Sequence, residues 1–83
     1  MKFYFGSVLG NTVLCNSDGS VVDITDTHTF DNFVIPIVDF LFEHGLHGFF
    51  GSGMCIIDNA DEAPFNIREC TFTVDNKNVT ITN

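Results

Sequence analysis

The chain has 83 residues and a formal net charge of −8, because eleven Asp and Glu residues face only Lys2, Arg68 and Lys77. Nucleic acids and anionic membranes are bound through Lys and Arg, so this composition argues against both as ligands. A chain of this length with 45% hydrophobic residues forms one domain, residues 1–83, and basic protein surfaces are the partners that suit its charge.

The N-terminal third predicts a three-stranded meander. Residues 2–9 are rich in aromatic and β-branched side chains, which is typical of a strand. Gly10-Asn11 has the composition of a two-residue hairpin turn, after which residues 12–15 return beside the first strand. The run 17–20 contains Asp-Gly, which suits positive φ, and residues 21–25 form the expected third strand.

The middle of the chain predicts one helix. Thr29 is the expected N-cap, and the regular helix runs from about residues 31–33 to His44, with Gly45 as a left-handed stop. A proline is tolerated near a helix start, where its missing N–H has no intrahelical partner. The positions that are not strongly apolar fall on one narrow stripe: Asn32, Pro36, Asp39 and Glu43. Everything else is apolar, so we expect burial over most of the helix circumference.

The C-terminal half predicts three further strands. A glycine-rich connection over residues 45–53 leads to a short apolar strand at 54–58, which an acidic loop at 59–66 follows. Residues 67–74 alternate as a strand does, and residues 79–82 form the last strand. The expected fold is therefore α+β, an antiparallel β-sheet in βββαβββ order with one largely buried α-helix packed on one face.

The three cysteines, Cys15, Cys55 and Cys70, cannot all pair within one chain. Their wide spacing and apolar neighbours are typical of buried free thiols in a reducing cytosol, so we expect a cytoplasmic protein. One disulfide with one remaining thiol is the alternative, and the distance between the thiols decides between the two.

No motif frames a catalytic or metal-binding residue. Two His and two Cys could be assembled into a zinc site on paper: His44, His47, Cys55 and Cys70. Zinc ligands normally come in pairs at short fixed spacing, and no second pair exists. Asp39 and Glu43 lie one helical turn apart, but a solvated carboxylate pair has no raised pKa for acid–base catalysis. The sequence predicts a protein that is not an enzyme and holds no cofactor or metal; the alternative is a small metal-dependent or thiol enzyme.

Carboxylates gather in two stretches without Lys or Arg, residues 16–31 and 58–62, and on the helix stripe. The candidate protein-binding residues are nine acids: Asp18, Asp23, Asp26, Asp31, Asp39, Glu43, Asp58, Asp61 and Glu62. Such an acidic surface would steer onto a basic cleft, whereas a merely solvated face is the alternative. Phe49 and Phe50 are candidate aromatic anchors, and a Phe that fills the edge of the core is the alternative.

A short, acidic, single-domain chain without a catalytic signature resembles the small inhibitors that phages and other mobile elements direct against host nucleic-acid enzymes, above all the anti-CRISPR proteins. The likeness is one of size and charge over the whole chain. It implies a stoichiometric inhibitor of a host CRISPR-Cas effector complex. Binding to its basic nucleic-acid-binding surface would act by DNA mimicry, with carboxylates in place of phosphates, or by steric block.

A small cytosolic structural or interaction module is the alternative to an inhibitor. In this interpretation a homodimer closes an exposed sheet edge and buries Phe49 and Phe50. It predicts a stable dimer in solution, with a mass that does not depend on salt.

Overall fold

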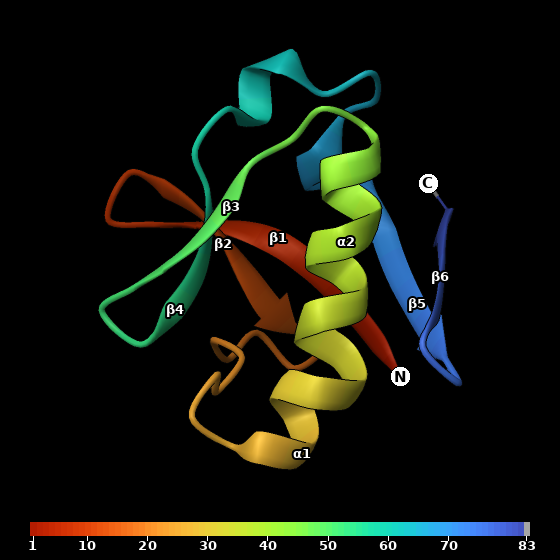
Figure 1. Cartoon of the computed structure of the whole chain (residues 1–83). Coiled ribbons are helices and arrows are strands. Elements are labelled where there is room, and N and C mark those ends of the chain that lie inside the picture. Colours follow the sequence, from red (N-terminus) through yellow and green to blue (C-terminus); the bar gives the residue numbers. More distant parts are fainter. Residues whose placement is uncertain (83) are drawn as a thin grey trace.

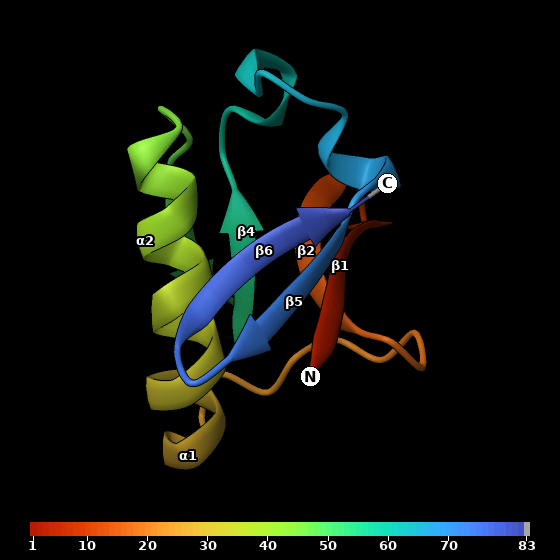
Figure 2. The same ribbon diagram turned by 90° about the vertical axis from the view of Figure 1, so that its right-hand side faces the viewer.

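The computed structural model describes residues 1–82, which form one antiparallel sheet of six strands with a helical segment against it. The strands are β1 Lys2–Val8, β2 Asn11–Asn16, β3 Gly48–Gly51, β4 Met54–Ile57, β5 Thr71–Asp75 and β6 Asn78–Thr82. Their order across the sheet is β3-β4-β2-β1-β5-β6. The helical segment crosses one face of the twisted sheet, between β3 and β6 (Figures 1 and 2). The predicted α+β class is confirmed.

Three two-residue turns join the strands into hairpins. Both residues of each turn have positive φ: Leu9-Gly10, Ser52-Gly53 and Asn76-Lys77. These are the φ signs of type I′ turns, whose twist matches that of the flanking strands. The first turn lies one residue before the predicted Gly10-Asn11, because Asn11 already pairs with Val8 in the β1–β2 ladder.

The predicted third strand over residues 21–25 is wrong. The segment contacts the sheet only at its start, where Val21 forms an isolated bridge to Cys15 and the Val22 N–H donates to the Leu14 carbonyl at 3.1 Å. The following residues form a turn instead, because the Asp23 carboxylate accepts a hydrogen bond from the Thr25 N–H at 2.9 Å. A local side-chain bond has therefore replaced the ladder that the β-branched composition suggested.

The remaining strand comes from the glycine-rich connection, residues 45–53. Phe49 and Phe50 favour extended backbone, and the segment pairs with β4 as the edge strand β3. The expected strand at residues 67–74 is shorter than predicted, since Ile67–Glu69 forms a 3₁₀ turn before β5 begins.

The helical segment begins earlier than predicted and is continuous over residues 27–43. It consists of α1 Thr27–Thr29, a π-helical turn Phe30–Val34 and α2 Ile35–Glu43. Asp26, and not Thr29, is the N-cap, because its carboxylate accepts from the Thr29 N–H at 3.2 Å. The π turn ends at Val34, two residues before Pro36, whose ring excludes the usual bond to the carbonyl four residues back. The wider turn accommodates this proline inside one helix.

The helix ends as predicted. Gly45 has a φ of +78° and donates from its N–H to the Phe42 carbonyl at 3.1 Å. The Leu46 N–H donates to the Leu41 carbonyl at 2.9 Å, which completes a Schellman motif. Within residues 1–82 no helix combines the length and the hydropathy needed to cross a membrane.

The core lies between the helix and one face of the sheet. It contains Phe3, Phe5, Leu14, Cys55, Ile57, Phe72 and Val74 from the sheet, with Val34, Ile37 and Leu41 from the helix. Phe72 is central to this cluster, because the ring centroids of Phe5, Phe40 and Phe65 lie 5.2, 6.0 and 6.4 Å from its own.

Phe42 was expected to be buried with the rest of the apolar helix residues, but 69% of its surface is exposed.

All three cysteine side chains are buried, as predicted. Cys15 and Cys55 are free thiols. The Cys70 Sγ donates to the Asn66 carbonyl at 3.2 Å. A disulfide bond that involves Cys15 or Cys55 is therefore not present in this structure.

Candidate protein-binding surfaces

The nine candidate carboxylates are all exposed, but they do not form a single surface. Asp18, Asp23 and Asp26 lie in the loop between β2 and α1, Asp31, Asp39 and Glu43 lie on the helical segment, and Asp58, Asp61 and Glu62 follow β4. The acids of residues 16–31 were predicted to form one group, because they are close along the chain. The fold separates the loop acids from the acids of the helix.

The loop acids have local structural roles. Asp18 accepts from the Ser20 hydroxyl at 2.6 Å and from its N–H at 2.9 Å, and Asp23 accepts from the same two groups of Thr25. These bonds, the hydroxyl first and then the backbone N–H, lower the pKa of both carboxyls. Asp26 caps the helix. Asp18 and Asp23 therefore stay charged. All three loop acids shape the backbone, which accounts for their presence without a partner.

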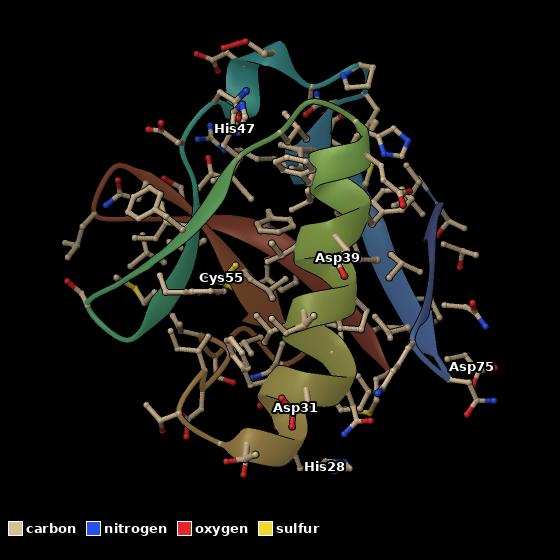
Figure 3. The ribbon with its side chains drawn as sticks, viewed as in Figure 1. His28, Asp31, Asp39, His47, Cys55 and Asp75 are labelled. Carbon is tan, nitrogen blue, oxygen red and sulfur yellow. The ribbon has the colours of Figure 1, made fainter. Side chains whose placement is uncertain are left out.

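The helix acids line a groove. Asp31, Asp39 and Glu43 border a space of about 380 Å³ between the helical segment and the β5–β6 hairpin, which contributes Lys77. Apolar or uncharged side chains complete the lining: Ile35, Pro36, Phe40, Asn78 and Val79. Figure 3 shows Asp31 and Asp39 on the same side of the helical segment. A groove with carboxylates and apolar walls suits a long basic side chain, because its stem packs on the walls while its charged end meets the acids.

The acids after β4 border a second groove. Asp58 and Asp61 line this space of about 200 Å³ together with Arg68. The Arg68 Nη2 donates to the Thr12 Oγ1 at 2.6 Å, which ties the guanidinium to β2. In sequence the stretch 58–62 has no base, but the fold brings Arg68 beside it. This surface is consequently less acidic than its sequence suggested.

Phe49 and Phe50 point to opposite faces of the sheet, because they are neighbours in a strand. Phe50 lies on the helix side, where its ring centroid is 5.2 Å from that of Phe30. Phe49 lies on the outer face, and a Cβ on Gly51 would be 3.4 Å from its ring. The two rings are 45% and 46% exposed. Each is therefore half packed and half available to a partner.

The four candidate zinc ligands, all within residues 1–82, do not gather into one site. The described residues assemble no group of three or more His, Cys, Asp or Glu that could hold a metal ion. Burial raises the pKa of Cys55 to about 11, so its thiolate is scarce at neutral pH. The His44 Nδ1 lies 2.8 Å from the Phe40 carbonyl, one helical turn back. Cys55 and His44 therefore each have local structural surroundings.

Charged residues are absent from two long stretches of the chain that the fold brings together. Residues 3–17 and 44–57 contain no Asp, Glu, Lys or Arg. These stretches supply the two hairpins β1–β2 and β3–β4, which lie side by side in the sheet. Three exposed apolar side chains belong to them, Leu9 at 92%, Phe49 at 46% and Phe50 at 45%. The missing charges were visible in the sequence, but the adjacency of the two hairpins was not.

Comparisons of the chain with protein-family models, with curated proteins and with solved structures gave no match. No residue role is therefore carried over from another protein. The functional argument depends on the chain's own charges, exposed side chains and grooves.

Proposed function

We propose that this protein is a non-enzymatic, acidic binding protein whose partner is a basic protein surface of the kind that holds nucleic acid. The likeness in size and charge to anti-CRISPR inhibitors makes a CRISPR-Cas effector complex the candidate partner, with the host cytoplasm as the place of action. Binding there would exclude DNA or RNA by mimicry or by steric block.

The observation that supports this proposal is the exposure of the acids on the helical segment. Asp39 and Glu43 are exposed one helical turn apart and share a groove with Asp31. Unlike the loop acids, they have no capping or turn role among the hydrogen bonds of residues 1–82, and a partner's Lys or Arg reaches them without disrupting the backbone. The loop acids extend the negative field and speed encounter with a basic surface.

The mechanism follows from charge-assisted pairing. Guanidinium and ammonium groups that normally hold phosphates would pair with Asp31, Asp39 and Glu43, while their aliphatic stems pack against the groove walls. The pairing energy of exposed charges is modest, so several pairs must act together. The net charge of −8 contributes mainly to the association rate and to its dependence on salt.

The test is capture of a guide-loaded CRISPR effector complex by the tagged protein from a host extract, repeated at rising salt. The double variant Asp39→Lys, Glu43→Lys reverses two of the three groove acids and leaves Asp31 in place. Its matched control is Glu69→Lys, Asp75→Lys, which changes the net charge equally at two exposed acids outside the candidate set. Capture should fall at least about tenfold for the groove variant and much less for the control.

Two outcomes would count against this proposal. Capture that is indifferent to salt and to both variants removes the electrostatic mechanism. Equal loss in both double variants shows that net charge alone matters, which removes the groove as the contact site.

A further inference from the structure

The edge strand β3 leaves half of its backbone polar groups without a strand partner. In the β3–β4 hairpin, Gly51 pairs with Met54 directly beside the two-residue turn. The pairs of an antiparallel ladder alternate, so the N–H and C=O groups of Gly48 and Phe50 point away from β4. Since β3 is the terminal strand of the sheet, these groups lie on its open edge.

This edge is short, at four residues, but it has no charge, proline or bulge to prevent pairing with another chain. Protected edges carry charged side chains, prolines or bulges. Residues 44–57 contain no charged residue and no proline, and the register of β3 against β4 runs without a bulge. At the opposite edge, β6 leaves no large apolar side chain exposed.

Exposed aromatic rings lie on both sides of the β3 edge. Phe50 lies on the helix side and Phe49 on the outer side. Phe42 of the neighbouring helix is 69% exposed, and its ring centroid lies 6.1 Å from that of His47, the residue before β3. An aromatic patch thus flanks an open strand edge in an otherwise strongly acidic molecule.

The helix acids lie away from this edge. Val38 faces β3, since a Cβ on Gly48 would be 3.7 Å from its Cγ2. Asp39 and Glu43 line the groove on the other side of the helix, next to β6. A partner on the β3 edge would therefore leave the acidic groove open.

We propose that β3 pairs antiparallel with β3 of a second copy of this chain, about a two-fold axis at Phe49. In this register Phe49 of each copy lies opposite Phe49 of the other on the outer face, and Phe50 lies opposite Gly48. The glycine leaves room for the ring, and the outward groups of both residues form the ladder. Phe42 covers the incoming Phe50 from the helix side.

The charge distribution indicates a second copy as the occupant, and the exposed apolar area indicates that the dimer is weak. Two chains of −8 repel each other except where their surfaces are uncharged, and β3 belongs to such a stretch. Phe42, Phe49 and Phe50 leave about 300 Å² exposed per copy, taking about 200 Å² for a whole aromatic side chain. A standard interface buries roughly 800 Å² per partner, so the dimer belongs to the weak class.

The test is sedimentation equilibrium of the full chain from about 10 µM to about 1 mM, a range that covers weak dimers. The variant Phe49→Glu places like charges opposite each other on the axis and should raise the dissociation constant at least about tenfold. The control Leu9→Glu adds the same charge at a side chain that is 92% exposed on the tip of the β1–β2 turn. It should leave the dissociation constant within about threefold.

A pair of variants with opposite charges distinguishes a lost interface from a disturbed fold. Phe49→Lys and Phe49→Glu should each be monomeric alone, and their mixture should form a heterodimer. A monomeric wild type at all concentrations would overturn the proposal, as would equal dissociation by Leu9→Glu or failure of the mixture to associate. Rising salt should preserve or strengthen the dimer while it weakens capture by a basic partner, so failure of one proposal leaves the other standing.

Discussion

The Asp26 carboxylate accepts from the Thr29 N–H at 3.2 Å and from the Thr29 hydroxyl at 2.6 Å. One oxygen of a candidate binding acid therefore satisfies a donor at the helix start that has no partner within the helix. The same residue contributes to stability as a cap and to the acidic field as a charge. Substitutions can separate these two roles.

Replacing Asp26 by Asn should preserve the cap and remove the charge, because Asn caps helices as well as Asp does. Asp26→Ala should lower the free energy of unfolding by about 1 kcal/mol. Urea denaturation of both variants measures the difference. Equal destabilisation by Asn and Ala would show that the charge, and not the hydrogen bond, stabilises the helix start.

Ser20→Ala should raise the pKa of Asp18 towards its ordinary value, since the Ser20 hydroxyl is the first cause of its lowering. The pKa of Asp18 is lower in the folded state than in the unfolded state. The stability that this carboxylate contributes is therefore present above its unfolded pKa and is lost as the pH falls through its folded pKa. NMR titration of the side-chain carboxyl measures the shift. Asp23, held by Thr25, serves as the internal reference and should not change.

Cys55 should make the protein less stable in alkali. Its pKa is raised by burial from 9.0 to about 11, so the unfolded state loses the thiol proton first. The contribution of the Cys55 thiol to the free energy of unfolding is intact below pH 9. It should decline by roughly 1–3 kcal/mol between pH 9 and about 11. Denaturation across this range, compared with Cys55→Ala, isolates the effect from other groups. Parallel curves for the two proteins would contradict it.

Phe72→Ala should destabilise the fold by about 3–5 kcal/mol, because the ring is fully buried and contacts three other aromatic rings. A domain of this size has little stability in reserve, so the variant should be largely unfolded in mild denaturant. Phe42→Ala is the matched control at a 69% exposed position and should change stability by no more than about 0.5 kcal/mol. Thermal unfolding monitored by circular dichroism measures both.

Much of the fold could be predicted from local patterns. The helix end at Gly45 depends on a residue that adopts positive φ, and the burial of Cys15 and Cys55 follows from their apolar neighbours. The errors arose where two local signals competed. Residues 21–25 are β-branched, but Asp23 bonds to Thr25 and turns the chain. The glycines of β3 indicated a loop, but an edge strand tolerates them.

The candidate site was predictable only as a set of residues. The nine acids are exposed as expected, since unpaired carboxylates are costly to bury. Their grouping was not predictable, because proximity along the chain does not fix proximity in the fold. The exposure of Phe42 was not predicted, because an apolar residue outside the polar stripe of the helix is expected to be buried.

The sequence by itself determined the shortage of positive charge, the first and last hairpins and the single helix, because these depend on composition and on contacts between near neighbours. Only the tertiary structure decided that the hairpins β1–β2 and β3–β4 lie side by side, that Lys77 shares a groove with the helix acids, and that Arg68 shares one with Asp58 and Asp61. Strand order is set by long-range pairing that buries both members of each ladder against the helix, and no local pattern specifies it.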